Sequence, residues 1–573
     1  MKDTNKNFEH NILSIPVIII ILIITFIAYL PSLENGFVDW DDNHYVKLNN
    51  DIKELSVTNL KKMFTSYYVS TYLPLTMVFY SIEYSVFKLN PAGYHWVNLI
   101  LHLINCILVY ILIFIISRKN FIAFVVSILF GIHTLHVESV AWIAELKDVL
   151  YSVFFLGTII SYIYYRQKLS KKLYFISVSL FLLSVLSKGV AVTAPVILIL
   201  IDYYLDRNNS SVNRNLNYLI RSIKNKIPFF IIALIFIIIG FYGQQESELV
   251  KEKNFFDFIQ NISNMCYGIL FYIIKMVAPI KLSCIYPETQ NLENGLKLLY
   301  TVAPAVVMGI SILLYVIRKY IPKFLFGLLF YLITIAPVIQ FIPIGRAIPA
   351  DRYFYIPSIG LFYIFAEIIY YVKTKYKGLI KICSWSLLIL ILFILTILTY
   401  QRCKVWKDGL TLTDDVIQNY KNIPVVYYNR GLIYSEKKEY DKAINEYGLA
   451  IKYKPTYFAA YNNRGNLYSN LGKYDEAISD FTEAINIKPG YIKAYHNRAT
   501  AYFFKGDYDK AISDYSKAIE LDTTFFPSYY NRILCYIKKG DYRSAEKDID
   551  KLKSIGYNID ETKLFKFRNN KKQ

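Results

Sequence analysis

Apolar and polar residues follow two different patterns along the chain, and the change falls near residue 405. Before this point, apolar runs alternate with short polar loops, whereas after it the pattern is helical, charged and repetitive. A helix needs about 20 apolar residues to cross a bilayer. The first part therefore predicts membrane-spanning helices near residues 12–31, 96–116, 121–141, 148–165, 173–187, 191–206, 227–243, 299–317, 324–343, 354–372 and 382–400.

One further apolar stretch, residues 264–279, affects the number of spans. If this stretch crossed the membrane, every later loop would lie on the opposite side. Two basic loops would then lie outside, against the preference of positive loops for the cytoplasm. We therefore expect a re-entrant or interfacial helix there, and about eleven spans. The first span has no small-x-small cleavage site and is long enough to cross, so we expect a retained anchor rather than a signal peptide.

The distribution of Lys and Arg predicts the orientation. Short positive loops stay in the cytoplasm. The Lys/Arg-rich loops are residues 117–120, 166–172, 221–226, 318–323 and 373–381. Placing all of them inside puts the N-terminus in the cytoplasm. It puts the first loop (residues 32–95) and everything after residue 400 outside the cytoplasm.

The second part of the chain repeats with a period of 34 residues. The segments YYNRG, YNNRG, YHNRA and YYNRI begin at residues 427, 461, 495 and 529, and Tyr and Ala recur at the same spacing. This period is typical of tetratricopeptide (TPR) helix pairs, which stack into a solenoid with a concave groove. We expect a linker helix at 406–423, about four repeats at 424–560 and a basic tail at 561–573.

The repeated Asn of this motif is a candidate for binding a ligand in the groove. It stands at Asn429, Asn463, Asn497 and Asn531, and each of these residues is followed directly by Arg. An equally good interpretation is that these side chains cap helices or bond neighbouring repeats.

Composition is consistent with a membrane part joined to a soluble part, since 55% of the 573 residues are hydrophobic. The net charge of +20 fits either nucleic-acid binding or positive cytoplasmic loops. The abundance of Ile, Asn, Lys and Tyr resembles the codon bias of an AT-rich genome, which weakens the first interpretation, and we expect no nucleic-acid partner. Six scattered Cys without a CxxC pair predict neither a zinc site nor a disulfide framework.

Ionisable residues gather on the outward side. The first loop places Asp39, Asp41 and Asp42 around Trp40, directly after the first span. Because charge at a membrane boundary is costly to desolvate, such residues mark function by default. A carboxylate here could act as a general base on a hydroxyl group or hold a divalent metal.

Later outward segments carry further candidates. They are His133, His136, Glu138, Glu145, Lys147, Asp148, Lys188, Arg346, Asp351 and Arg352. The cations could hold a phosphate, the arginines in bidentate fashion. Alternatively, the cations at span ends are interface anchors, and Arg352 forms a structural ion pair with Asp351. His133 and His136 could share a helix face and bind metal, but no third His is near, so we predict no metal ligands.

Five segments in this order, followed by TPRs, resemble a known family. They are FVDWDDNHYV (37–46), HTLHVESVAWIAELKDVL (133–150), LSKGVAVTAPVILILIDYYL (186–205), LSCIYPE (282–288) and ADRYFYIPSIGLF (350–362). They are similar to the membrane-embedded TPR glycosyltransferases, bacterial relatives of the transmembrane-and-TPR O-mannosyltransferases. The resemblance covers nearly the whole chain.

The resemblance implies an all-α chain with a polytopic GT-C-type helix bundle, followed by the TPR α-solenoid. It implies an inverting glycosyltransferase in a bacterial cell membrane. The enzyme would move a sugar, mannose by family analogy, from a polyprenyl-phosphate donor to a protein or glycan hydroxyl on the extracytoplasmic face. The TPRs would engage the acceptor, through the Asn residues named above.

The family pattern also implies roles for individual residues. Asp41 would be the catalytic base and Asp42 its support, with Asp39 a weaker candidate. The residues expected to bind the lipid phosphate or sugar are Lys147, Lys188, Arg352, Arg346, His136 and Glu138. Leu146, Gly189 and Thr134 stand where relatives often carry Arg, Pro and Pro, which leaves the phosphate contacts open.

Two other functions fit the same pattern. A membrane-tethered TPR scaffold without activity would need the repeats but not Asp41. A transporter of lipid-linked sugars would place charges deep in the membrane, whereas most of the charges here lie at the outer mouths of the spans.

Overall fold

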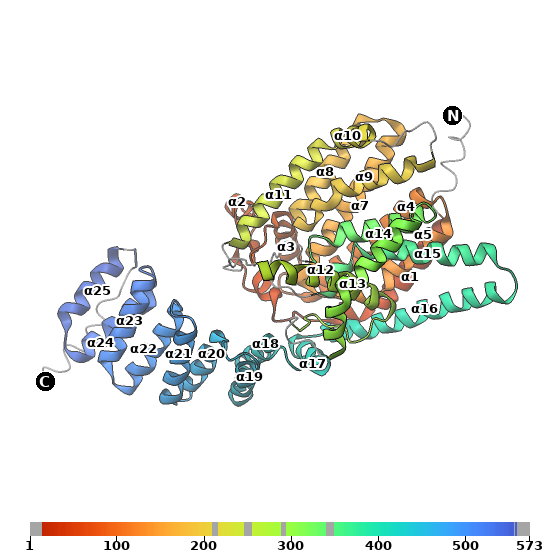
Figure 1. Cartoon of the computed structure of the whole chain (residues 1–573). Coiled ribbons are helices and arrows are strands. Elements are labelled where there is room, and N and C mark those ends of the chain that lie inside the picture. Colours follow the sequence, from red (N-terminus) through yellow and green to blue (C-terminus); the bar gives the residue numbers. More distant parts are fainter. Residues whose placement is uncertain are drawn as a thin grey trace. The chain divides into compact units, whose positions relative to one another are not determined.

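The computed structural model describes residues 14–208, 216–245, 255–287, 294–339, 349–554 and 556–557. Within these ranges the regular structure is helical, apart from one isolated β-bridge between Tyr68 and Thr71. The chain forms two compact units, residues 1–421 and 422–573 (Figure 1). The all-α prediction is therefore confirmed. The expected basic tail at 561–573 lies outside the described residues.

The first unit contains the apolar helices. They are α1 (Ile15–Tyr29), α2 (Val57–Thr65), α3 (Pro74–Phe87), α4 (Pro91–Ser117), α5 (Asn120–Ile132), α6 (Val137–Ala141), α7 (Leu146–Lys168), α8 (Lys171–Ser187), α9 (Ala194–Leu205), α10 (Leu216–Lys224), α11 (Ile227–Gln245), α12 (Phe255–Val277), α13 (Asn294–Ile317), α14 (Pro322–Ile335), α15 (Ser358–Lys375), α16 (Leu379–Cys403) and α17 (Gly409–Asn419). The expected linker helix is α17, and it belongs to this first unit.

Helices occupy all the predicted span ranges, but they differ in length. Among the described residues, 4 helices are long and apolar enough to cross a membrane, or up to 6 if each of two bent pairs is one span. The four are Ile15–Glu34, Pro91–Ser117, Lys297–Ile317 and Leu379–Trp406. Others, such as α9 and α14, are shorter apolar helices. The number of about eleven spans stays a prediction.

Helix α4 is the central element of this unit. It begins at Pro91, with the side chain of Asn90 accepting a hydrogen bond from the Ala92 amide, and it packs against α5 and α7. Its buried polar residues reach across to neighbouring backbone. Asn98 Nδ2 donates to Trp142 O at 3.1 Å, and Asn105 Nδ2 donates to Val149 O at 2.9 Å. These bonds fix the segment between α6 and α7 on which the charged residues lie.

Two glycines allow α14 and α15 to approach closely. A Cβ atom added at Gly327 would lie 2.5 Å from Gly360 O, and one added at Gly360 would collide with Gly327 O. The obstacle is backbone in both cases, so it cannot be relieved by rotating a side chain. Because the short helix η9 (Asp351–Phe354) leads into α15, this contact also fixes the position of Arg352.

The second unit consists of four helix pairs. They are α18 (Pro424–Glu436) with α19 (Tyr440–Tyr453), α20 (Phe458–Asn470) with α21 (Tyr474–Ile487), α22 (Ile492–Lys505) with α23 (Tyr508–Leu521), and α24 (Phe526–Lys539) with α25 (Tyr542–Ser554). The second helix of each pair starts at the recurring Tyr, and the recurring Ala is fully buried in each repeat. The 34-residue period therefore predicted the TPR helices correctly.

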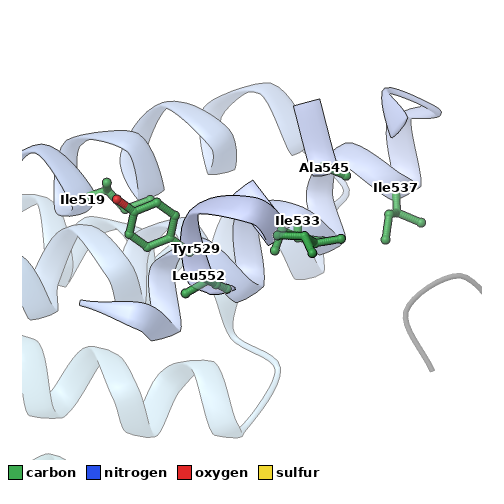
Figure 2. Close-up of a cluster of buried hydrophobic side chains, with 7 residues drawn as sticks. Ile519, Tyr529, Ile533, Ile537, Ala545 and Leu552 are labelled. Atoms are coloured by element: carbon green, nitrogen blue, oxygen red, sulfur yellow. The ribbon is translucent and has the colours of Figure 1, made fainter. Parts of the chain in front are cut away.

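Two features hold the helix pairs together. In the first two repeats a glycine lets the paired helices touch: a Cβ at Gly465 would lie 2.8 Å from the Phe481 ring. An Arg pairs with an acid 16 residues later, as Arg464 NH2 does with Asp480 Oδ1 at 2.8 Å. At the end of the solenoid, Ile519, Tyr529 and Leu552 help to close the last apolar core (Figure 2).

The glycine contact gives a test of the packing that supports the site. We expect Gly360→Ala to lower the free energy of unfolding by about 1–3 kcal/mol, because the backbone of α14 must move away. Gly309→Ala in α13 is the matched control, since a Cβ there meets nothing within 4 Å and Ala favours helix. Thermal unfolding of the detergent-purified protein measures both. Equal midpoints for the two variants would contradict the close approach.

Candidate functional site

The charged residues predicted from the sequence meet where α6 turns into α7. Between these helices the chain forms a short 3-10 helix, Ile143–Glu145, and three buried groups hold its backbone. In addition to the bond from Asn98, Tyr80 OH donates to Ile143 O at 2.9 Å. The Ala144 amide donates to Asp42 Oδ1 at 2.9 Å. The turn is thus tied both to α3 and α4 and to the first loop.

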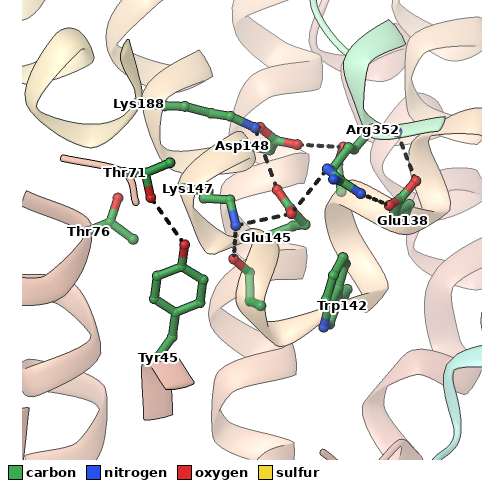
Figure 3. A network of polar contacts seen from close by, with 12 residues as sticks. Tyr45, Thr71, Thr76, Glu138, Trp142, Glu145, Lys147, Asp148, Lys188 and Arg352 are labelled. Carbon is green, nitrogen blue, oxygen red and sulfur yellow. Dashed lines mark hydrogen bonds and ion pairs between the residues drawn. The ribbon is translucent and has the colours of Figure 1, made fainter. Parts of the chain in front are cut away.

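Glu145, which is buried, stands at the centre of a network of charges. Its Oε1 lies 3.1 Å from Lys147 Nζ and 3.4 Å from Arg352 Nε. Its Oε2 lies 3.6 Å from Lys188 Nζ. One carboxylate therefore faces three cations that come from α7, the end of α8 and η9, as Figure 3 shows.

Two further acids complete this network. Glu138 Oε2 accepts a hydrogen bond from the Arg352 amide at 3.0 Å, and Glu138 also pairs with the Arg352 guanidinium. Asp148 pairs with Lys188 and accepts a hydrogen bond from Ser139 Oγ at 3.1 Å. We call the six residues Glu138, Glu145, Lys147, Asp148, Lys188 and Arg352 the charged network. Its three acids balance its three cations.

The acids and the cations of the charged network differ in exposure. The three acids are buried, whereas Lys147, Lys188 and Arg352 keep 10%, 16% and 22% of their side-chain surface exposed. Burial alone would raise the pKa of Glu145, but the charges of Lys147, Lys188 and Arg352 outweigh it and hold that pKa well below its usual range. The buried acids therefore hold three cations whose side chains keep a small exposed fraction.

The three acids of the first loop have different surroundings. Asp42 is buried and accepts backbone hydrogen bonds from Val38 at 2.8 Å and from Ala144 at 2.9 Å. Asp39 pairs with Lys47 at 2.8 Å. Asp41 is half-buried and, among the described residues, makes no hydrogen bond or ion pair. Its charge nevertheless acts on Asp42 and on Lys147, so it lies near the charged network.

Tyr45 joins the first loop to the charged network from below Lys147. The Lys147 ammonium lies 4.7 Å from the centre of the Tyr45 ring and also donates to Ala144 O at 3.0 Å. Tyr45 OH and Thr71 Oγ1 are 3.3 Å apart (Figure 3). The aspartates of the first loop, the 143–148 turn and Arg352 thus belong to one site.

Two predicted residues are not part of this group. His136 is buried among aromatic rings, with Nδ1 2.7 Å from Phe130 O and its ring 4.9 Å from that of Tyr355, and no bond joins it to the charged network. Arg346 lies outside the described residues. In the part of the chain that the structure describes, no three His, Cys, Asp or Glu side chains are grouped so that they could hold a metal ion.

The TPR asparagines contact neighbouring repeats. Asn463 Nδ2 donates to Tyr428 OH at 3.0 Å, and Asn497 Nδ2 donates to Asn462 Oδ1 at 3.0 Å. Asn531 bonds to Tyr515. Asn429 is half-buried like the others. These contacts support the interpretation that the repeats are bonded to one another, and a role in binding an acceptor stays a prediction.

The sequence analysis named Glu145 and Asp148 among the outward-facing ionisable residues but assigned neither of them a role in the site. The signal is the segment Glu145-Leu-Lys-Asp148, in which two acids flank a cation at the start of a helix. Because their partners lie about 40 and 200 residues further along the chain, spacing alone could not reveal them.

Comparison with known proteins finds matches to the TPR repeats alone and to most of the whole chain. A family model described as tetratricopeptide repeat matches residues 458–491 and 492–525, and one described as TPR repeat matches residues 431–472. The protein O-mannosyl-transferase F38B6.6 of Caenorhabditis elegans is 26% identical over 77% of this chain and 63% of its own length. The chain is a TPR-containing relative of the protein O-mannosyl-transferases. The resemblance inferred from the motifs is therefore confirmed.

Other relatives carry the same name. Human protein O-mannosyl-transferase TMTC1 is 23% identical over 68% of this chain and 49% of its own length. The chain thus spans about half to two thirds of the length of these two relatives. Among solved structures, MamA 41-end from Desulfovibrio magneticus RS-1 is 20% identical, with a TM-score of 0.25, over 26% of this chain and 82% of that one.

Removal of the central carboxylate tests the charged network. We expect Glu145→Gln to cost about 3–5 kcal/mol of unfolding free energy, because three fixed cations lose their shared counter-charge. Glu54→Gln, at an exposed position of the first loop, is the control and should be neutral. Denaturant unfolding in detergent compares the two. A neutral Glu145→Gln would mean that water or other groups hold these cations.

Asp42 gives a test by pH. Burial raises the pKa of Asp42 to about 7, although the amides of Val38 and Ala144 lower it. The folded state then holds a proton that the unfolded state releases near pH 4, so the free energy of unfolding should fall as pH rises from about 4 to about 7, by about 4 kcal/mol at most. The stability advantage of the wild type over Asp42→Asn should shrink across this interval. An advantage that grows instead would show that the two hydrogen bonds keep the carboxylate ionised.

Proposed function

We propose that the chain is an integral membrane glycosyltransferase of the inverting GT-C class. It moves a sugar, in the simplest case mannose, from a polyprenyl-phosphate donor to a hydroxyl group of a protein or glycan. The names of the relatives support sugar transfer, and the helices of span length support a membrane location. The observation that carries the proposal is the placement of Asp41, an acid without a bonded partner in the described part of the chain, beside Lys147 of the charged network.

Asp41 is the proposed general base. A base must be near the hydroxyl group whose proton it takes, and it must not be blocked by a strong partner. Asp39 is engaged by Lys47, and Asp42 accepts two backbone hydrogen bonds. Asp42 instead ties the first loop to the Ala144 amide, which keeps its neighbour Asp41 close to the charged network.

Arg352 and Lys188 are the proposed phosphate ligands. The Lys147 ammonium already faces Glu145, Ala144 O and the Tyr45 ring. Arg352 and Lys188 are the more exposed of the three cations. Since the charged network is balanced overall, it would bind a phosphate through directed N–H donors rather than through net charge. Lys147 would act on Asp41 and on the leaving phosphate from a short distance.

The reaction follows from this arrangement. Asp41 takes the proton of the acceptor hydroxyl, whose oxygen forms a bond to the anomeric carbon of the donor sugar. The bond between that carbon and the phosphate oxygen breaks, and its electron pair leaves with the lipid phosphate, whose developing charge Arg352 and Lys188 stabilise. Attack opposite to the leaving group inverts the anomeric carbon.

Loop charge supports the orientation of the enzyme. The Lys/Arg-rich loops favour a cytoplasmic N-terminus, which places the first loop, the charged network and the TPRs on the extracytoplasmic side. In this proposal the TPR groove engages the acceptor, since TPR solenoids offer concave surfaces of peptide size.

Asp41→Asn tests the proposed function. We expect it to reduce transfer by roughly 10²–10⁴-fold, the usual contribution of a general base, with unchanged thermal unfolding. Purified variants would receive radiolabelled polyprenyl-phosphate sugars and an extract of secreted and membrane proteins, and label in protein would be counted.

Glu54→Gln, which changes an exposed acid of the same loop, is the control and should transfer like the wild type. Full activity in Asp41→Asn would remove Asp41 from the reaction. The absence of label with folded wild type and every donor would favour a membrane-tethered TPR scaffold.

A further inference from the structure

The segment that follows the last apolar helix returns to the site. After α16 the chain forms a short 3-10 helix, Lys404–Trp406, and then α17. Trp406 is fully buried, and its ring is stacked on that of Trp142, with 5.2 Å between centroids and 28° between planes. Trp142 lies at the turn that carries the charged network: it directly precedes the 3-10 helix Ile143–Glu145, and its carbonyl oxygen accepts a hydrogen bond from the Glu145 amide at 3.1 Å.

Trp142 is also in contact with the proposed phosphate ligand. The Arg352 guanidinium carbon lies 5.7 Å from the Trp142 ring centre, within the range in which a cation is attracted to an aromatic face. Figure 3 shows the Trp142 ring beside Arg352. The indole Nε1 atoms of Trp142 and Trp406 have no hydrogen-bond partner among the described residues. Ring packing, rather than a hydrogen bond, therefore holds this stack.

Backbone contacts fix the segment that carries Trp406. Asn35 Nδ2 donates to Cys403 O at 2.9 Å, and the Gly36 amide donates to Lys407 O at 2.8 Å. A Cβ at Gly36 would lie 3.3 Å from Lys407 O, so the approach is tight. Both ends of the 403–407 segment are thus bonded to the beginning of the first loop.

A second connection reaches the neighbour of Arg352. Arg402 NH1 pairs with Asp415 Oδ2 of α17 at 2.6 Å, and its charge lowers the pKa of Asp351, which burial raises. Asp351 Oδ1 in turn accepts a hydrogen bond from Tyr286 OH at 2.6 Å. Arg402 and Asp415, on either side of Trp406, therefore act on Asp351, while Trp406 itself stacks on Trp142, the ring that Arg352 contacts.

We propose that Trp406 is a positioning residue for Arg352: by stacking on Trp142 it fixes the aromatic surface against which the guanidinium is held. The phosphate role of Arg352 rests on the proposed function, but its position does not. Without the Trp406 ring, Trp142 can rotate, and Arg352 loses its contact with Trp142. It then keeps Glu138, Glu145 and the ring of its neighbour Tyr353, 5.1 Å away. In full-length protein, the effect of Trp406 should then pass through Arg352.

The first experiment measures Arg352 directly, independently of any activity. Purified Trp406→Leu, Trp406→Phe and wild type would be treated with phenylglyoxal, and modification of each arginine would be followed by mass spectrometry. We expect Arg352 to react several-fold faster in Trp406→Leu and nearly as in the wild type in Trp406→Phe, which keeps a ring. Arg166, held by Asp202 and Asp206 elsewhere in the same unit, should not change and reports that the unit is folded.

An unchanged rate at Arg352 in Trp406→Leu, with Arg166 protected, would overturn the proposal and leave Trp406 as core packing alone. Faster reaction of Arg166 as well would mean partial unfolding. The Trp142→Leu variant then decides, since it removes the ring that Arg352 contacts directly: reaction that is faster at Arg352 than at Arg166 supports the proposal, and equal changes at both contradict it.

The second experiment measures binding of undecaprenyl phosphate by native mass spectrometry. We expect Arg352→Lys and Trp406→Leu each to weaken binding roughly ten-fold, and the double variant to be no weaker than Arg352→Lys, because the two residues act in series. Independent, multiplying losses would contradict the proposal. If wild type and Arg352→Lys bind equally, the phosphate role fails, while phenylglyoxal modification still decides the role of Trp406. Trp385→Leu, at the other end of α16 against Phe121, is the control.

Discussion

The buried carboxylate of Glu145 is the group on which the site depends. It faces Lys147, Lys188 and Arg352, which come from three separate parts of the sequence. Three cations cannot be kept in a partly buried position without counter-charge, because their desolvation is costly. Glu138 and Asp148 share this task, so each cation has an acid on one side and an exposed part on the other. The balance of charge stabilises the fold, and the small exposed fraction of the three cations is what the proposed phosphate binding depends on.

The surrounding structure holds the backbone on which Glu145 lies. Asn98 reaches Trp142 O from α4, Tyr80 reaches Ile143 O from α3, and Asp42 accepts from Ala144. Three successive residues are therefore tied by side chains that are themselves buried. Such rigid support is what a site needs if donors are to be aimed before a ligand arrives. The same arrangement explains why Asp41 lies near Lys147, although the two residues are about 100 positions apart in the sequence. The bond from Ala144 to Asp42 holds the first loop against this turn.

The sequence predicted much of this fold, because the relevant patterns are local. The 34-residue period located the TPR helices, and apolar runs located the helices of the first unit. The three aspartates around Trp40 were found by their density in one loop. The role of Glu145 and the stack of Trp406 on Trp142 were not predictable from the sequence. Each depends on a contact between residues more than 200 positions apart, and neither tryptophan lies in a recognisable repeat. His136 shows the reverse case, since its promising spacing leads into an aromatic core.

The most direct test of the account is an experimental structure of the full-length protein in a lipid bilayer with undecaprenyl phosphate bound. The account predicts the phosphate within hydrogen-bonding distance of Arg352 and Lys188, with the Asp41 carboxylate facing the side from which an acceptor hydroxyl would approach. A phosphate bound away from the charged network, or one held only by Lys147 with Asp41 turned toward a fixed partner, would contradict it.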